Sequence, residues 1–323
     1  MSLPALRALR EHYPNAHIAV LALPWVADLY GREPFCDEVI PYPSGRGRKD
    51  WRAKLHLASA LKAPRFDAAI LLQNAFEAAL VAWLARIPVR IGYNRDGRGL
   101  LLTHAIPVPA KGSIPRHESY YYLELLRRAG LQPAWPDEMV IRLDGAASAR
   151  ETGLAALAKL GIRGPVVGVS PGAAYGNAKR WLPERFAEAA AKLGKTVLLF
   201  GSGSERDLCE TVANDLRGRG VEVYNMAGRT TLREFIEMVA ACRVMLTNDS
   251  GAMHISSALG VPTVTVFGAT DHIGTGPTGP LARIVREPVE CSPCLLRECP
   301  IDHRCMKAVT ADRVVEEALH IIQ

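Results

Sequence analysis

The second half of the chain alternates between short apolar runs and amphipathic helical patterns. The runs PVVGVS, KTVLLFG, VEVYNM, RVMLTN and PTVTVFG are continuously apolar, as is typical of strands in a parallel sheet covered on both faces. Between them, PERFAEAAAKLG, SERDLCETVANDLRG, TLREFIEMVAAC and GAMHISSALG place apolar residues at helical spacing. This alternation predicts a doubly wound α/β domain.

The first half repeats the alternation less regularly. HIAVLAL, DEVIPY, FDAAILLQ and VRIGY predict strands, and we expect helices around residues 51–61, 75–85 and 117–128. The predicted fold class is therefore α/β, with two Rossmann-like domains facing each other across a cleft. We place the first domain at residues 1–160 and the second at 161–323, after the Pro-rich stretch LQPAWPDEMVIRLDG.

The first domain opens in a helical pattern, Leu3 to His12, and not in a strand. A right-handed βαβ crossover needs a strand before its helix. We therefore expect that the opening strand of this half is missing from the sequence.

Composition and charge narrow the classes of partner. The net charge of +6 suits an anionic substrate or an anionic membrane surface, and a solvated basic surface explains it equally well. No zinc-finger, RNA-recognition or helix-turn-helix pattern is present, so we expect no nucleic-acid partner. No apolar run approaches the roughly 20 residues of a membrane span, and MSLPALRALREHYP is not a signal peptide, which predicts a cytoplasmic protein.

The segment NDSGAMH, from Asn248 to His254, lies where a predicted strand gives way to a helix. Ligands of open α/β sheets bind beyond such strand ends, and the first N–H groups of a helix attract phosphate. Asp249 or Ser250 can cap the helix, Gly251 allows close approach to the backbone, and His254 can donate to the same anion. A plain capped helix with a packed histidine explains the pattern as well.

A second loop, PGAAYGNAKRW, follows the strand PVVGVS and carries Lys179 and Arg180. It lacks the Gly-Lys-Ser/Thr of a nucleotide-binding P-loop and its magnesium-binding hydroxyl. Two strand-end loops in one domain, one with lysine and one with helix amides and histidine, nevertheless form a plausible metal-free diphosphate clamp. Taken alone, Lys179 is better explained as a surface lysine.

Other chemistry has weak support. GSGSERD supplies only G-x-G, so a nicotinamide-dependent oxidoreductase lacks its third glycine and ribose-binding acid. Four cysteines fall in CSPCLLRECPIDHRC, at Cys291, Cys294, Cys299 and Cys305. The Cys-x-x-Cys pair resembles half of a zinc site, but the later spacings are too tight for a second half, and reduced thiols in a loop remain the alternative.

The motifs together resemble one family. PGAAYGNAKRW, the NMAGRTTL run and TNDSGAMHISSALGVPTVTVFGATD are similar to glycosyltransferase family 9, the ADP-heptose:lipopolysaccharide heptosyltransferases, and most similar to its type II members. LLQNAFEAALVAWLARIPVRIGY extends the resemblance into the first half. The resemblance implies a GT-B fold. It also implies an inverting, metal-independent transfer of heptose from ADP-L-glycero-β-D-manno-heptose to the lipopolysaccharide inner core, without a cofactor.

The resemblance also implies roles for individual residues. The second domain would bind the donor, with Lys179 neutralising the departing ADP and Asp249 positioning its turn. Asn225, Met226 and Ala227 would lie at the adenosine. The donor-binding residues so predicted are Gly172, Ala173, Lys179, Asn225, Met226, Ala227, Asp249, Ser250, Gly251 and His254.

The first domain would bind a lipid-linked lipopolysaccharide acceptor at the anionic inner membrane. Arg46, Arg48, Lys49, Arg95 and Arg98 are candidates for its acidic groups, although a solvated basic loop is the simpler explanation for each. The family's base is an aspartate in a Gly-Asp loop, and no matching residue is present, so the catalytic base is unassigned. The alternatives are a truncated, non-catalytic nucleotide-sugar-binding protein and a family relative that uses another sugar donor.

Overall fold

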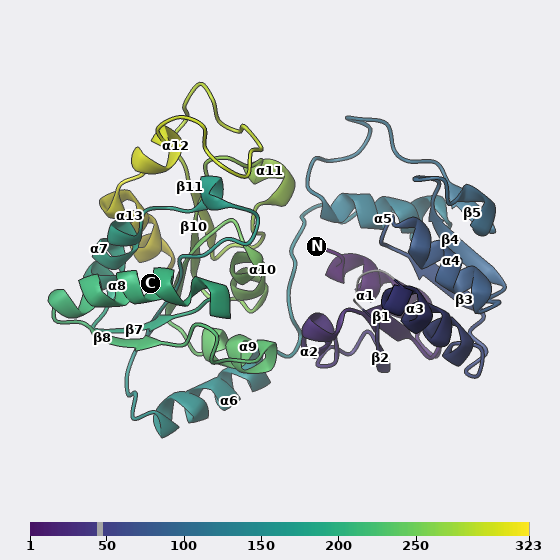
Figure 1. Ribbon diagram of the computed structural model, residues 1–323, viewed down its shortest axis with the longest axis horizontal. Helices are drawn as coiled ribbons and strands as arrows, with labels where there is room; N and C mark the ends of the chain where they lie inside the picture. Colours follow the sequence, from purple (N-terminus) through teal and green to yellow (C-terminus); the bar gives the residue numbers. More distant parts are fainter. Residues whose placement is uncertain (44–47, 323) are drawn as a thin grey trace. The chain divides into compact units, whose positions relative to one another are not determined.

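The computed structural model describes residues 1–43 and 48–322, which form two compact units, Met1–Glu138 and Met139–Gln323 (Figure 1). The predicted division at residue 160 falls later than the structural one. The difference is helix α6 (Ala146–Lys159), which packs against α9 (Leu232–Ala240) and so belongs to the second unit. The roles predicted for the two domains stay predictions.

The second unit is built on one parallel sheet of six strands in the order β11-β10-β9-β6-β7-β8. Its strands are β6 (Val167–Ser170), β7 (Thr196–Leu199), β8 (Glu222–Asn225), β9 (Val244–Asn248), β10 (Thr263–Val266) and β11 (Ala282–Val285). All four central strands, β6, β7, β9 and β10, are buried along their whole length, as their continuous apolar runs predict. The order reverses between β6 and β9, so this pair marks the topological switch point.

Helices form two layers around this sheet. The helices described in this unit are α6, α7 (Pro183–Leu193), α8 (Arg206–Gly218), α9, α10 (Gly251–Ala258), α11 (His272–Thr275), α12 (Arg304–Lys307) and α13 (Ala311–Ile322), with the 3-10 turns η3 (Asn177–Lys179) and η4 (Gly203–Glu205). Helix α7 packs against α8 and α13, whereas α9 packs against α6 and α10. Right-handed crossovers that run in opposite directions from the switch point place these two layers on opposite faces.

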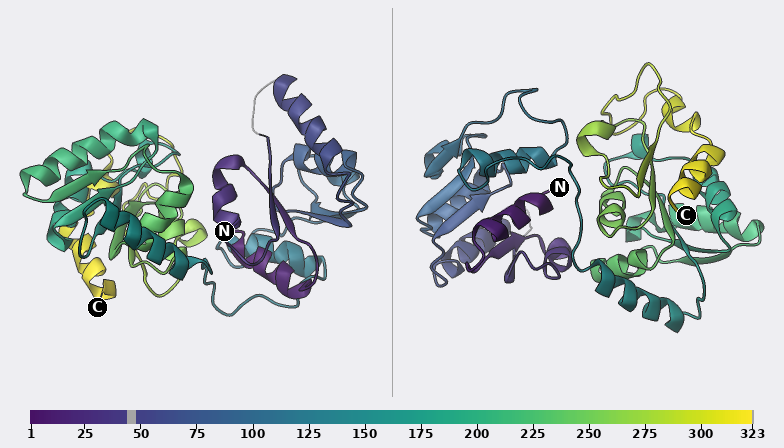
Figure 2. Two further views of the ribbon diagram at one scale, coloured as in Figure 1. Left: turned by 90° about the horizontal axis from the view of Figure 1, so that it is seen from below. Right: turned by 180° about the vertical axis from the view of Figure 1, so that it is seen from behind.

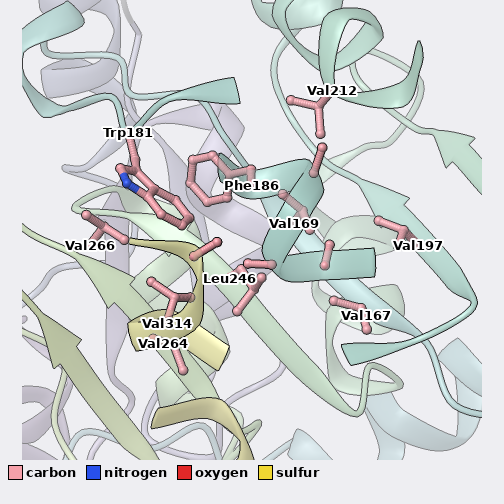
Figure 3. Close-up of a cluster of buried hydrophobic side chains, with 14 of the residues drawn as sticks. Val167, Val169, Trp181, Phe186, Val197, Val212, Leu246, Val264, Val266 and Val314 are labelled. Atoms are coloured by element: carbon pink, nitrogen blue, oxygen red, sulfur yellow. The ribbon is translucent and has the colours of Figure 1, made fainter. Parts of the chain in front are cut away.

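The core of the second unit lies between the sheet and the α7–α8–α13 layer (Figure 3). Trp181 and Phe186 meet edge to face there, with ring centroids 4.9 Å apart. The Trp181 indole N–H donates to the carbonyl of Val309 over 3.1 Å, so its one polar atom is satisfied inside the core. The strand-end loop that contains Lys179 is therefore anchored by a buried aromatic residue two positions later.

The first unit has two small parallel sheets and not one continuous sheet (Figure 2). The pairs are β1 (Ala19–Ala22) with β2 (Glu38–Pro41), and β3 (Ala68–Leu71) with β4 (Val89–Tyr93) and β5 (His104–Ile106). The helical segments are α1 (Leu3–His12), η1 (Pro24–Val26), α2 (Ala27–Tyr30), α3 (Arg48–Ala60), α4 (Phe76–Leu84), η2 (Gly99–Leu101) and α5 (Ser119–Arg128). Helix α1 packs on α5, and α3 packs on α4 over an apolar cluster that includes Leu57, Leu61 and Val81. Within residues 1–43 and 48–322, none of the helices is both long and apolar enough to cross a membrane.

Candidate functional site

The switch point of the second unit brings the two predicted ligand loops together. Strand β6 pairs in parallel with β9, and Ser170 lies opposite Thr247 in the register. Both strands therefore end at the same edge of the sheet, and the chain leaves them through PGAAYGNAKRW and NDSGAMH. This neighbourhood follows from the strand order and could not be established from either motif alone.

Asn248 joins the two loops, a role that the sequence analysis missed. Its side chain is fully buried at the end of β9; Nδ2 donates to the carbonyl of Pro171 over 2.7 Å, and Oδ1 accepts the backbone N–H of Trp181 over 2.9 Å. One amide thus fixes both ends of the loop that carries Lys179. A polar residue at the last position of a continuously apolar strand is the signal that could have revealed it.

Lys179 and Asp249 form the central ion pair of the site. Nζ of Lys179 lies 2.7 Å from Oδ2 of Asp249, and the two side chains are only 15% and 7% exposed. The ammonium group also lies 5.0 Å from the ring centroid of Tyr175, within cation–π range. The ion pair and the aromatic ring hold Lys179 in a half-buried position, so it is not an unconstrained surface lysine.

The start of α10 is not capped as expected. Ser250 occupies the N-cap position, but in the described part of the chain its side chain accepts no capping hydrogen bond and lies 3.2 Å from the hydroxyl of Thr247. Asp249 pairs with Lys179 through Oδ2, and the cap expected of Ser250 is wrong. A Cβ atom added to Gly251 would meet open space, and His254 lies half-buried one turn later. The positive end of α10 is thus left for an anion beside a lysine.

Gly172 and Ala173 belong to the loop that carries Lys179. A Cβ atom on Gly172 would lie 1.9 Å from Oε1 of Glu205, so the absence of a side chain there admits that carboxylate. Ala173 is buried, and its carbonyl accepts from the guanidinium of Arg180 over 3.3 Å. The buried Nε of Arg180 has no hydrogen-bond partner among residues 1–43 and 48–322. Arg180 is thus a second cation beside the switch point.

Asn225 is the last residue of β8, two strands from β6, and Met226 and Ala227 follow it. The side chain of Asn225 turns onto the protein itself: Nδ2 donates to Glu210 over 2.7 Å, and Oδ1 accepts the N–H of Ala227. A Cβ atom on Gly228 would lie 2.8 Å from the Cα of Gly203, so the loops after β7 and β8 touch through their backbones. These contacts shape the turn, and the predicted adenosine contact stays a prediction.

The cysteine-rich segment braces the Lys179 loop. The N–H of Ala178 donates to the carbonyl of Arg297 over 3.1 Å, and a ring nitrogen of His303 lies 3.2 Å from the carbonyl of Ala178. The hydroxyl of Tyr175 donates to the carbonyl of Leu295 over 3.3 Å. Sequence reasoning found no role for this segment, and its contacts now supply one.

The four cysteines of that segment are free thiols. Cys305 is buried, whereas Cys291, Cys294 and Cys299 are half-buried. Burial raises the pKa of the Cys305 thiol, and the nearby Cys291 and Cys299 raise it further. Among the described residues, no group of three His, Cys, Asp or Glu side chains is arranged to hold a metal ion.

The basic candidates of the first unit do not share one environment. Arg46 lies outside the described residues, and Arg48 and Lys49 are the first two residues of α3. Arg95 is exposed, with its Nε 3.6 Å from the carboxylate of Asp96. Arg98 differs from the expected solvent-facing group, because it is fully buried and donates to the carbonyls of Gln73 and Tyr93. Its guanidinium organises strand ends within the protein.

Comparison with known proteins identifies the family. The family model described as glycosyltransferase family 9 (heptosyltransferase) matches residues 54–304. The chain belongs to glycosyltransferase family 9. It is 32% identical over 297 residues to lipopolysaccharide heptosyltransferase 2 of Salmonella typhimurium, covering 88% of this chain and 84% of that protein. It is 30% identical to lipooligosaccharide heptosyltransferase 2 of Haemophilus influenzae, over the same shares of the two chains.

Solved structures agree with this family membership. ADP-heptose lipopolysaccharide heptosyltransferase II of E. coli matches with a TM-score of 0.82 and 29% identity, covering 99% of this chain and 94% of that one. An E. coli heptosyltransferase solved with ADP matches with a TM-score of 0.74 at 18% identity, which supports the fold. The predicted α/β fold of GT-B type is confirmed, and the family 9 chain is a glycosyltransferase.

Proposed function

We propose that this family 9 glycosyltransferase transfers heptose from ADP-L-glycero-β-D-manno-heptose to the inner core of lipopolysaccharide, with inversion and without a metal ion. The observation that carries the proposal is the Lys179–Asp249 ion pair, 2.7 Å long, at the switch point beside the uncapped start of α10. The relatives named above supply the choice of sugar and acceptor.

The chemistry that such a site supplies is stabilisation of a leaving diphosphate. As the bond from the sugar to ADP breaks, negative charge grows on the diphosphate oxygens. The N–H groups at the start of α10 and the ammonium group of Lys179 are fixed in place beforehand, and preorganised charges of this kind are usually the largest catalytic contribution. Gly251 and His254 would contact the diphosphate and sugar, and Ser250 would donate its hydroxyl.

Arg180 and Lys179 together would replace the metal ion that many nucleotide enzymes use. Both side chains lie on one loop, and Asn248 fixes that loop at Pro171 and Trp181. Arginine and lysine form strong charge-assisted hydrogen bonds to phosphate oxygens. The proposed binding of the adenosine near Asn225, Met226 and Ala227 places it beyond the ends of β7 and β8, where two backbone loops touch.

The proposed acceptor is lipid-linked, so the enzyme would work in the cytoplasm at the anionic face of the inner membrane. The net charge of +6 favours such peripheral contact. The first unit would bind the acceptor, with Arg95 as the one predicted basic group whose side chain is described and exposed.

The proposal is tested by incubating the protein with ADP-heptose and heptose-deficient lipopolysaccharide, in the presence of a chelator. We expect ADP release and a product heavier by one heptose, with inverted anomeric configuration. Lys179→Met should reduce the rate by about 10²–10³-fold, as for loss of one preorganised donor. The matched control is Lys192→Met, since Lys192 is an exposed lysine of α7 that pairs with Asp312.

Three results would count against the proposal. ADP-heptose binding without transfer would support the non-catalytic nucleotide-sugar-binding alternative. Transfer from a different nucleotide sugar would support the relative with another donor. Loss of activity in chelator that returns with added metal would contradict the metal-free mechanism.

A further inference from the structure

Five large apolar side chains of the first unit are exposed on three adjoining elements. They are Trp51 and Leu55 of α3, Phe76 and Trp83 of α4, and Leu100 of η2, and their exposed fractions run from 44% to 97%. Helix α3 packs on α4 (Figure 1), and α4 contacts η2. We call these five side chains the aromatic face.

Helix spacing shows that the aromatic face is separate from the core. Trp51 and Leu55 are one turn apart on α3, whereas Leu57, Ala58 and Leu61 of the same segment pack into the apolar cluster beneath. Phe76 and Trp83 are two turns apart on α4, while Val81, Ala82 and Ala85 enter that cluster. Both helices are thus apolar on the core side and again on the outer side.

Helix α4 is the clearer case. Its sequence, FEAALVAWL, contains one charged residue, Glu77, and a helix that is apolar all round normally lies in a core or in lipid. Glu77 accepts from Nζ of Lys54 over 2.6 Å. The outer side of α4 therefore has no polar group of its own beyond this ion pair, and contact with water leaves Phe76 and Trp83 poorly solvated.

The charges around the aromatic face are mainly positive. Nζ of Lys54 holds the carboxylates of both Asp50 and Glu77 at 2.6 Å. Among the side chains that the structure describes, the exposed charged ones on α3 and α4 and in the segments that follow them are the basic Arg52, Lys62, Arg65 and Arg86 and the acidic Asp67. Exposed tryptophan with arginine and lysine matches the polar–apolar boundary of an anionic bilayer. A second copy of the chain would instead bring like charges together.

The aromatic face also adjoins the edge where an acceptor would bind. Buried Arg98 donates to the carbonyl of Gln73 and, over 3.2 Å, to Oδ1 of Asn74, just after strand β3 ends. Phe76 follows Asn74 by two residues, and Leu100 follows Arg98 by two. Ligands of parallel sheets bind at this carboxyl edge of the strands. A lipid-anchored sugar could therefore reach that edge without leaving its membrane.

We propose that the aromatic face is the surface by which this enzyme docks on an anionic phospholipid membrane, with Trp51, Phe76, Trp83 and their neighbours in the headgroup boundary and the arginines on the lipid phosphates. The inference rests on the proposed function for the choice of a lipid-linked acceptor.

The test is flotation of the purified protein with vesicles of phosphatidylethanolamine and phosphatidylglycerol, compared with vesicles of phosphatidylcholine. We expect binding to the anionic vesicles that weakens with salt. The double variant Trp83→Ser with Leu100→Ser should lower this binding about tenfold, because both side chains leave the apolar boundary. The matched control is Trp25→Ser in η1, a tryptophan of the same unit that is 60% exposed and outside the aromatic face.

Two further measurements distinguish an anionic membrane from a second copy of the chain as the partner of the aromatic face. Arg52→Glu with Arg86→Glu should weaken anionic-vesicle binding and leave gel-filtration mass unchanged. Equal binding by wild type and the Trp83–Leu100 variant would overturn the proposal, as would a dimer that the variant dissociates. Transfer to a delipidated acceptor should be unchanged by the Trp83–Leu100 variant, whereas failure of the proposed function would abolish that transfer in the wild type and leave vesicle binding intact.

Discussion

Nζ of Lys179 and Oδ2 of Asp249 lie 2.7 Å apart, although 70 residues separate them in the chain. The carboxylate is 7% exposed, so removal of the lysine leaves a buried negative charge where we propose a diphosphate. We expect Lys179→Met to weaken ADP-heptose binding about 10- to 100-fold, measured by calorimetry, which combines lost attraction with new repulsion.

The second half of this prediction is non-additivity. Asp249→Asn in the Lys179→Met background should recover part of the lost affinity, because it removes the uncompensated charge. If the two substitutions weaken binding independently, Asp249 does not act through Lys179. Thermal unfolding of each variant separates a folding defect from a binding defect.

Gly176 tests the contact between the Lys179 loop and the cysteine-rich segment. A Cβ atom there would lie 2.0 Å from the carbonyl oxygen of Arg297, a backbone atom that cannot move alone. We expect Gly176→Ala to destabilise the protein by about 1–3 kcal/mol in urea unfolding and to weaken ADP binding. Gly218→Ala at the end of α8 is the control, because nothing lies within 4 Å of its added Cβ. Unchanged stability of the Gly176→Ala variant would show that the cysteine-rich segment moves away from the added methyl group at no cost in free energy.

Arg98 tests the strand ends of the first unit. Replacement by methionine leaves the carbonyls of Gln73 and Tyr93 without their donor, and we expect a loss of about 2–4 kcal/mol in the free energy of unfolding. Arg95→Met should change it by less than about 0.5 kcal/mol, since Arg95 is exposed. Equal stability of the two variants would contradict a structural role for Arg98.

Glu124 gives a pH-dependent prediction. Its buried carboxylate accepts from Arg127 over 2.7 Å and Arg128 over 2.6 Å, and these hydrogen bonds hold its pKa below the ordinary value. A carboxyl whose pKa is lower in the folded state stabilises the protein above its unfolded pKa, near 4.3. That contribution is lost as the pH falls through the lower folded pKa.

We therefore expect Glu124→Gln to lower stability by about 1–3 kcal/mol at pH 7 and to flatten the loss of stability below about pH 4.3. The control is Glu316→Gln, which removes an exposed ion pair with Arg313 and should cost at most about 1 kcal/mol. The free energy of unfolding is measured from pH 7 to pH 3. Its curves against pH should converge at low pH for Glu124→Gln and wild type. Parallel curves would contradict the prediction.

The sequence predicted the second unit better than the first, for a physical reason. Strands β6, β7, β9 and β10 are buried on both faces, so each is a continuous apolar run. The strands of the first unit are only partly buried and lie in two sheets, and β5 with His104 has no apolar run to reveal it. Helix α6 was missed because it packs outside α9, which makes its apolar stripe narrow.

The sequence predicted the two loops of the candidate site, but it did not predict which of their side chains contact each other. Lys179 and Asp249 were both named, but their ion pair depends on β6 lying beside β9, which no local pattern reports. Asn248 was overlooked because its function is to join backbones from two loops. Arg98 was predicted to contact the acidic groups of the acceptor, because the pattern of a charged residue in a Gly-rich turn does not show whether its side chain is buried.

The bonds from Ala178 to Arg297 and His303 also set an order of assembly during synthesis. The ribosome makes Lys179 first, and the segment that holds this loop is made more than 100 residues later, because His303 follows Ala178 by 125 positions. A nascent chain that has reached β10 already contains every residue of the proposed diphosphate clamp, yet its loop still lacks the brace. The proposed binding of the nucleotide sugar therefore depends on a segment made more than 100 residues after Lys179, and it has its brace only when Arg297 and His303 have emerged and docked.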